Sequence, residues 1–285
     1  MQALLTKNSI NCGGQLISLA EPKVMGILNC TPDSFFSESR VGSDRELVNN
    51  AKRMLEHGAT FIDIGGQSTR PGAEQVSVDE ELKRVVPAIK LLLTEFPTAL
   101  ISVDTFYAEV AKQAIDAGAI MVNDVSAGMV DPNMFEEVAK LKVPYVLMHN
   151  RGKALANQEA PQYNHLVLDI IQFFAEKVKE LTQLGIPDVI LDPGFGFGKS
   201  LEQNYALLQQ LKQFQILELP LLVGVSRKSM VQRVLDVDAI NALNGTSAIH
   251  MIALERGARI LRIHDVKEAV ECIKIFNFAR KSVKS

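Results

Sequence analysis

The chain has 285 residues, of which 47% are hydrophobic and 22% are charged, and this supplies enough apolar material for a large core. The formal net charge of −3 leaves no basic excess, which argues against a protein that binds the phosphates of a nucleic acid. Cys12, Cys30 and Cys272 are odd in number and lack the spacing of a metal site, which favours free thiols in a reducing compartment.

The first ten residues lack the charged and apolar regions of a signal peptide. No apolar run approaches the roughly 20 residues that a membrane-spanning helix needs. We therefore expect a cytoplasmic protein with no membrane and no nucleic acid among its partners.

Short apolar runs alternate with helical stretches along the chain. Residues 9–19 come first, and their Gly-Gly pair between two short apolar pieces predicts a β-hairpin. The predicted strands that follow are 24–29, 60–66, 99–104, 119–124, 144–150, 188–192, 219–227 and 259–265. Runs this continuously apolar are typical of parallel strands whose outer face is covered by helices.

Helical periodicity fills the intervals between these runs, and a last helix is expected at about residues 266–281. Eight strand–helix units in a chain of this length predict an α/β fold of the (β/α)8 TIM-barrel class. We expect a single domain over residues 1–285, with the N-terminal β-hairpin (residues 1–20) closing one end of the barrel. A doubly wound open sheet is the alternative, because the sequence does not give the order of the strands in space.

Polar side chains at the carboxyl ends of the strands are the candidate site residues, because active sites of such barrels form there. One set combines two carboxylates, an amide and an ammonium: Asp104, Asn123, Asp192 and Lys228. A carboxylate accepts two parallel N–H bonds, so this set suits a flat heterocycle with adjacent N–H donors. Each residue alone could simply cap the next helix, but polar groups at every strand end favour a ligand site.

A second set is mostly cationic or hydroxyl-bearing and consists of Asn29, Thr69, Arg70, Arg262 and His264. Such donors suit phosphate groups. An amide oxygen among phosphates indicates a Mg²⁺ ligand, because Mg²⁺ shares oxygen ligands with phosphates and water. Together the two sets predict chemistry that joins a polar aromatic ring to a diphosphate.

The glycine-rich stretch GFGFGK at 194–199 follows Asp-Pro and lacks the spacing of a dinucleotide-binding loop. The sequence also has no metalloprotease histidine pair, no Ser–His–Asp order and no Walker A motif. Alternating glycine and phenylalanine instead predict a loop whose backbone comes close to a flat ligand.

Nine motifs in order carry a resemblance to the dihydropteroate synthases. They are MGILNCTPDSFF (25–36), DIGGQSTRPGA (63–73), SVDT (102–105), NDVSA (123–127), LMHNRG (147–152), LDPGFGFGK (191–199), GVSRKSM (224–230), NGTSA (244–248) and RIHDV (262–266). The resemblance implies a (β/α)8 transferase of folate biosynthesis and a target of sulfonamides. Such enzymes condense 6-hydroxymethyl-7,8-dihydropterin diphosphate with 4-aminobenzoate to give 7,8-dihydropteroate and pyrophosphate.

The resemblance also implies a role for each matching residue. Asn29 is the expected Mg²⁺ ligand, and Asp104, Lys228 and Arg262 are the expected catalytic residues. The expected substrate-binding residues are Thr69, Asp104, Asn123, Met148, Asp192, Phe197, Gly224, Lys228, Arg262, Ile263 and His264 for the pterin diphosphate, and Phe35, Arg70, Pro71 and Ser229 for the aminobenzoate. The expected partners are these two small molecules and a second copy of the chain, in a homodimer formed through the late helices.

Two alternative functions are compatible with parts of the pattern. A related barrel that passes a methyl group from a methylated folate to a corrinoid protein shares NDVSA and LDPGFG, but STRPG, SRKS and RIHD favour the synthase. A catalytically silent paralogue should have lost Asn29, Arg70, Lys228 or Arg262, and all four are present. Cys30 and Gln67 depart from the commonest wording of the family, which more often has an aliphatic residue and Glu there.

Overall fold

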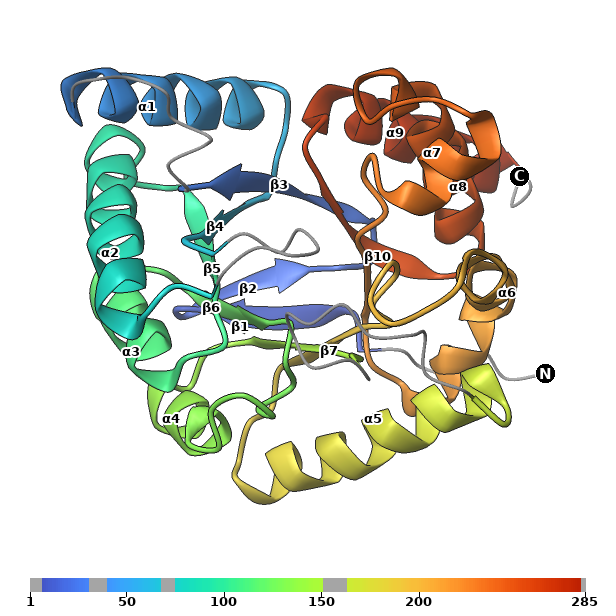
Figure 1. Cartoon of the computed structure of the whole chain (residues 1–285), viewed down its shortest axis with the longest axis horizontal. Helices are drawn as coiled ribbons and strands as arrows, with labels where there is room; N and C mark the ends of the chain where they lie inside the picture. Colours follow the sequence, from blue (N-terminus) through green and yellow to red (C-terminus); the bar gives the residue numbers. More distant parts are fainter. Residues whose placement is uncertain (1–6, 31–39, 68–74, 151–162, 283–285) are drawn as a thin grey trace.

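The computed structural model describes residues 7–30, 40–67, 75–150 and 163–282. Parallel strands form a closed barrel in the order β10-β3-β4-β5-β6-β7-β8-β9 (Figure 1). The strands are Lys23–Asn29 (β3), Phe61–Gly65 (β4), Leu100–Asp104 (β5), Met121–Asp124 (β6), Tyr145–Met148 (β7), Val189–Asp192 (β8), Leu221–Val223 (β9) and Ala258–Ile263 (β10). The predicted TIM barrel is confirmed, and the open sheet is wrong because β10 pairs with β3 and closes the ring.

Helices surround the barrel (Figure 1). They are Arg40–Glu56 (α1), Val78–Glu95 (α2), Ala108–Asp116 (α3), Met134–Leu141 (α4), Leu166–Gln183 (α5), Leu201–Gln210 (α6), Ser229–Leu235 (α7), Leu243–Glu255 (α8) and Val266–Ser282 (α9), with 3-10 helices at Leu211–Leu217 (η2) and Ile240–Ala242 (η3). None of the helices in the described ranges has the length and apolar character to cross a membrane.

One strand is much shorter than its apolar run predicts. The run 219–227 forms a strand only at Leu221–Val223. Beyond it the backbone turns, with the N–H of Lys228 bonded to the carbonyl of Val225 at 3.2 Å and with Arg227 in the left-handed region at φ 52°. The turn brings Lys228 back over the mouth of the barrel instead of extending the sheet.

The N-terminal end of the barrel is closed by the predicted hairpin, whose strands are Ser9–Cys12 (β1) and Gln15–Ser18 (β2). Hairpin and barrel share one buried apolar cluster: Ile10, Cys12, Ile17, Leu19, Met25, Phe61, Met121, Val146, Ile190, Leu222 and Ile260. Lys7 anchors the hairpin by an ion pair of 2.6 Å with Asp188, which precedes β8. The hairpin therefore acts as a plug.

The functional side chains form the next layer above this plug. Side chains alternate between the two faces of a strand, so residues two positions beyond the cluster face the same interior. On the barrel strands those residues are Ile27, Asp63, Asn123, Met148, Asp192, Gly224 and Arg262. The register pairs Gly65 with Asp104 and Asp104 with Asn123, which places Asp104 beside this layer. The polar layer lies at the carboxyl ends of the strands, as predicted.

Replacing Ile10 by alanine should lower the free energy of unfolding by about 2–4 kcal/mol, because the fully buried side chain leaves a cavity in the plug. Leu16→Ala in the same hairpin is the control, since Leu16 is 71% exposed and should change stability by less than about 0.5 kcal/mol. Denaturant unfolding of both variants measures the difference. Equal stability of the two variants would contradict the plug.

Candidate active site

Arg262 on β10 lies between two buried carboxylates. Its Nε donates to Asp63 Oδ2 at 2.6 Å, and its Nη2 donates to Asp104 Oδ2 at 2.5 Å. Asp63 Oδ2 also accepts from Asn123 Nδ2 at 2.9 Å. Four strands, β4, β5, β6 and β10, thus contribute to one network across the barrel interior. The two ion pairs fix the plane of the guanidinium, which has few other low-energy orientations once both bonds are made.

The charged groups in this network shift one another's pKa values. Burial raises the pKa of Asp104 to about 7, against the guanidinium of Arg262, and the nearby carboxylate of Asp63 adds to the increase. Burial opposes the charge on Arg262, but Asp63 and Asp104 together raise its pKa above the usual range. Arg262 therefore stays cationic, while Asp104 changes its charge close to neutral pH.

Asp192 and Lys228 face the same space from β8 and from the turn before α7. Asp192 Oδ1 accepts the N–H of Gly194 at 2.8 Å. Lys228 Nζ donates to the carbonyl of Phe195 at 2.6 Å and lies 4.6 Å from the centre of the Phe197 ring. Burial raises the pKa of Asp192, against the ammonium of Lys228, and burial lowers the pKa of Lys228 to about 8, against Asp192. Asp192 and Lys228 thus both contact the same loop, one at the N–H of Gly194 and the other at the carbonyl of Phe195.

The glycines of this loop are required by close approaches. Gly194 and Gly196 have φ of 71° and 81°. A Cβ on Gly194 would lie 2.0 Å from the carbonyl oxygen of His149, and one on Gly196 would lie 3.2 Å from Lys228 Cδ. The loop therefore packs its backbone against neighbouring parts of the barrel mouth. Its predicted approach to a flat ligand stays a prediction.

The two side chains expected beside that ligand belong to one apolar wall. Met148 is buried with Phe106 and Val125, and Phe197 packs against the same group. The floor is Gly224, where an added Cβ would have Arg262 Cβ and Lys228 Nζ as its nearest neighbours, each 3.9 Å away. An apolar wall, a glycine floor and polar groups around them are the features of a small-molecule site.

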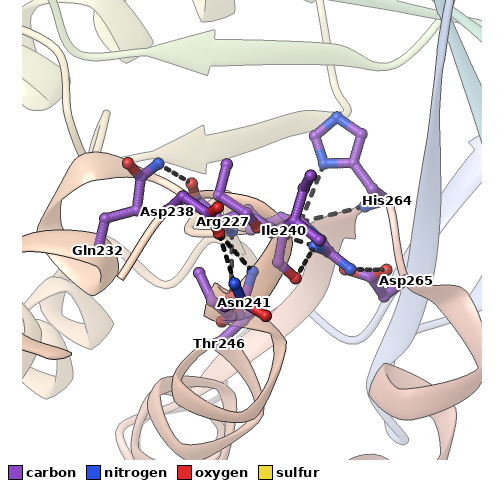
Figure 2. Close-up of polar contacts among 11 residues, drawn as sticks. Arg227, Gln232, Asp238, Ile240, Asn241, Thr246, His264 and Asp265 are labelled. Carbon is purple, nitrogen blue, oxygen red and sulfur yellow. Dashed lines mark hydrogen bonds and ion pairs between the residues drawn. The ribbon is translucent and has the colours of Figure 1, made fainter. Parts of the chain in front are cut away.

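His264 follows β10 and is paired with Ser226. Ser226 Oγ accepts the backbone N–H of His264 at 3.2 Å and lies 3.0 Å from His264 Nδ1 (Figure 2). The contact with Nδ1 runs in either direction, depending on which nitrogen of the ring carries the proton. Although the residue as a whole is exposed, desolvation of the ring and the nearby charge of Arg262 lower the pKa of His264 to about 4, so the ring is neutral at pH 7. In the tautomer that accepts the serine hydroxyl hydrogen at Nδ1, the ring carries its own proton on Nε2 and can donate it to an anion.

Arg227 holds the turn that precedes Lys228 and Ser229. Its Nε and Nη2 form ion pairs of 2.7 and 2.8 Å with Asp265, and its Nη1 donates to the carbonyls of Ala239 and Ile240 at 2.8 and 2.6 Å (Figure 2). With both ends of its guanidinium engaged, Arg227 serves the scaffold of the site. Ser229, the first residue of α7, is exposed at the surface of the turn.

Some of the predicted residues are not brought into the polar layer. Ile263 is buried in the core between strands and helices, so its side chain faces away from the barrel interior. Phe35, Thr69, Arg70 and Pro71 lie outside the described residues, and their roles stay predictions.

Gln67 and Val76 are joined by two hydrogen bonds. Gln67 donates from Nε2 to the Val76 carbonyl at 3.2 Å and accepts the Val76 N–H at 3.1 Å. The same Nε2 donates to Glu81 Oε2 at 2.8 Å, and burial raises the pKa of Glu81 to about 7. The amide of Gln67 always carries the N–H that it donates to the Glu81 carboxylate. A carboxylate at position 67 would have to be protonated first to donate there.

Asn29 ends β3 beside the polar layer. Its Oδ1 lies 3.8 Å from the position of a Cβ on Gly65, next to the side chain of Asp104. Among the residues that the structure describes, no three His, Cys, Asp or Glu side chains form a metal cluster. One amide oxygen fits a Mg²⁺ ion whose other ligands are diphosphate and water, and it does not fit an ion held by protein alone.

Two residues of the site were missed by reasoning from the sequence. Asp63 lies inside β4, two residues before its end, whereas the candidate residues were those at the strand ends. The signal was a lone acid in the apolar run FIDIG, which a barrel interior tolerates only with a partner. Lys199 ends the motif LDPGFGFGK, but the charge pattern alone assigned it no role.

Comparisons with known proteins agree with this geometry. A model of the family of pterin binding enzymes matches residues 25–264. The dihydropteroate synthase of Escherichia coli (strain K12) is 44% identical over 264 residues, which cover 92% of this chain and 93% of that protein.

Two solved structures are similar over nearly the whole chain. The Yersinia pestis dihydropteroate synthase in complex with a sulfonamide drug has a TM-score of 0.89 and 43% identity, covering 96% of this chain and 99% of that one. The Xanthomonas albilineans dihydropteroate synthase with 4-aminobenzoic acid has a TM-score of 0.88 and 39% identity, with the same coverage of 96% and 99%.

The barrel, its apolar plug and the polar layer above it define the class of pterin-binding barrel enzymes. Within that class, the chain belongs to the dihydropteroate synthase family, which makes it a transferase of folate biosynthesis.

Asp63→Asn should lower kcat/KM by about tenfold to a hundredfold, because Arg262 loses one of two charge-assisted hydrogen bonds, each worth about 1.5–3 kcal/mol. The control is Glu80→Gln, which removes the ion pair of 3.0 Å with Arg84 outside the barrel and should leave kcat/KM within about twofold. Steady-state kinetics on both variants measures this. Normal kinetics for Asp63→Asn would show that the guanidinium needs only Asp104.

Proposed function

We propose that this chain joins 6-hydroxymethyl-7,8-dihydropterin diphosphate to 4-aminobenzoate, forming 7,8-dihydropteroate and releasing pyrophosphate. The observation that carries the proposal is the single interior layer that combines acids, an amide and cations above the plug, with Arg262 at its centre. The 4-aminobenzoic acid in one Xanthomonas albilineans structure and the 7,8-dihydropteroate in another support the arylamine and the product.

The pterin ring would lie between Met148 and Phe197, above Gly224. Asp192 is free to accept N–H groups of the amino-pyrimidinone edge through Oδ2, since only Oδ1 is bonded to Gly194 among the described contacts. Asn123 on β6 supplies a further donor and acceptor, and Lys228 in the turn before α7 supplies further donors. A buried, pre-oriented polar set of this kind discriminates strongly against rings that lack the matching groups.

The diphosphate would lie over Arg262 and His264, with Thr69 beside it. Arg262 supplies a permanent positive charge, and the neutral His264 would donate from Nε2 in the tautomer that accepts from Ser226 at Nδ1. The Ile263 backbone lies between these two residues. Mg²⁺ bound through Asn29 and the phosphates would supply further charge neutralisation on the leaving group.

The reaction then follows from charge. The C–O bond at the pterin methylene breaks, pyrophosphate takes the electron pair, and the positive charge left behind delocalises into the ring. Ionised Asp104 stabilises that cation, as a pre-oriented charge in a dry site does. The aniline nitrogen of 4-aminobenzoate attacks the methylene carbon and afterwards loses a proton, so no strong base is needed. Phe35, Arg70, Pro71 and Ser229 are the residues proposed to frame the aminobenzoate.

Asp192→Asn should keep the fold and weaken binding of the pterin diphosphate by about tenfold or more, because a charge-assisted pair of hydrogen bonds is lost. Asp188→Asn is the matched control, since Asp188 directly precedes the same strand at the opposite end of the barrel. Isothermal titration calorimetry on both variants measures the change. Unchanged affinity in Asp192→Asn would remove Asp192 from the pterin site.

The pH profile of kcat/KM should be bell-shaped. Activity rises as pH increases through about 7, because Asp104 loses its proton and can then stabilise the cation. It falls as pH increases through about 8, because Lys228 loses its charge.

Asp104→Asn should lower kcat by about 10²–10³ with little change in pterin affinity, and the acid limb of the pH profile should disappear. Equal losses in kcat and pterin affinity would contradict this role for Asp104.

We also propose a homodimer formed through the late helices. On α8, the apolar stretch AIHMIAL (248–254) packs largely against the rest of the chain, since Ile249 and Leu254 are buried. Apolar side chains remain exposed on α7, η3 and α9. They are Val234, Leu235, Ile240, Ile275 and Phe278, with exposed fractions of 56%, 46%, 78%, 62% and 76%. Of these helices, α7 and α9 lie on one side of the barrel with α8 (Figure 1). Sedimentation equilibrium should give twice the chain mass of 31.3 kDa, and a monomer would contradict the proposal.

A further inference from the structure

A buried lysine lies behind the proposed pterin site. Lys199 ends the glycine loop and directly precedes Ser200, which caps the start of α6. Its side chain is only 9% exposed. Burial of an ammonium is costly, so its contacts need to be strong ones.

The ammonium has three acceptors for its three hydrogens. Lys199 Nζ lies 2.9 Å from the Gly194 carbonyl oxygen, 3.2 Å from the Phe197 carbonyl oxygen and 3.1 Å from His149 Nδ1. The first two acceptors are the two ends of the loop segment 194–197, and the third is on the strand-end residue against which Gly194 packs. One side chain thus ties the loop to itself and to the end of β7.

The loop held in this way carries contacts of the site on its other side. The N–H of Gly194 binds Asp192, the carbonyl of Phe195 accepts from Lys228, and the Phe197 ring lies beside the same ammonium. A shift of the loop would therefore disturb the acid, the base and the apolar wall together.

We propose that Lys199 is a positioning residue of the pterin site: its ammonium holds the carbonyls of Gly194 and Phe197 so that the loop presents Asp192, Lys228 and the Phe197 ring in the geometry that binds the pterin. The proposal rests on the proposed function, because it concerns the same site.

The charge on Lys199 adds a pH dependence. Burial lowers the pKa of Lys199 to about 7, against the carboxylate of Asp192 and together with the ammonium of Lys228. His149 faces it from the end of β7. Below pH 7 the ammonium donates to all three acceptors. Above it the neutral amine keeps two hydrogens for the two carbonyls, can no longer donate to His149 Nδ1 as well, and loses the charge that strengthens these bonds. The hold on the loop therefore weakens as pH rises through about 7.

The test compares Lys199→Met with the wild-type chain in calorimetric titrations with the dihydropterin diphosphate at pH 6 and at pH 8.5. Binding by Lys199→Met should be weaker by about tenfold or more at pH 6, and the ratio to wild type should shrink at pH 8.5, where wild type has lost the ammonium. KM for the pterin should rise more than kcat falls. The control is Lys7→Met, which removes a lysine that also binds a carbonyl and an aspartate, at the far end of the barrel.

Affinity within twofold of wild type at pH 6 would overturn the proposal, and so would a loss of equal size at both pH values, because packing alone does not titrate. Failure of wild type itself to bind the pterin would overturn the proposed function, and the two failures are thus distinguishable. Should Lys199→Met not fold, Lys199→Gln takes its place, since it keeps two donors without the charge. It should bind more weakly than wild type at pH 6, and wild-type affinity there would overturn the proposal.

Discussion

The site depends on one arginine held between two buried acids inside the barrel. A buried guanidinium is tolerated only when its charge is balanced and its donors are engaged, and Arg262 meets both conditions through Asp63 and Asp104. Such pairs seldom add net stability, but they fix orientation. The same network holds Asn123 through Asp63, and the charge of Arg262 opposes the rise that burial and Asp63 cause in the pKa of Asp104, so the geometry and the electrostatics of the polar layer have one common origin.

The other half of the site is arranged around Asp192. The charges of Lys228 and Lys199 both act on this carboxylate. Burial raises the pKa of Asp192 and lowers the pKa of each lysine, so all three pKa values move toward neutral pH. Both lysines reach the acid's surroundings through the same glycine loop, which the left-handed glycines allow to fold tightly. The loop GFGFGK therefore links the proposed binding of a flat ring to the protonation of the groups around it. Its Phe197 lies beside the proposed ring site, and its Lys199 is one of the groups that titrate.

Much of this could be predicted from the sequence, because strand ends in a barrel converge. Apolar periodicity predicted the barrel and its plug, and Asp104, Asn123, Asp192, Lys228 and Arg262 do meet in the structure. Asp63 was missed because periodicity shows where a strand ends but not which charge inside it has a partner across the barrel. The strand in the run 219–227 was predicted too long, because the pattern of apolar residues does not show that the backbone turns before Arg227 and adopts a left-handed conformation there. The expected contribution of Thr69 and its neighbours stays a prediction.

The most direct test of the account is release of pyrophosphate by the purified chain supplied with the dihydropterin diphosphate and Mg²⁺, with and without 4-aminobenzoate. The account predicts release that depends on the arylamine, with 7,8-dihydropteroate as the second product. Pterin binding without arylamine-dependent release would contradict it, and the cationic end of the polar layer would then need a different anionic ligand.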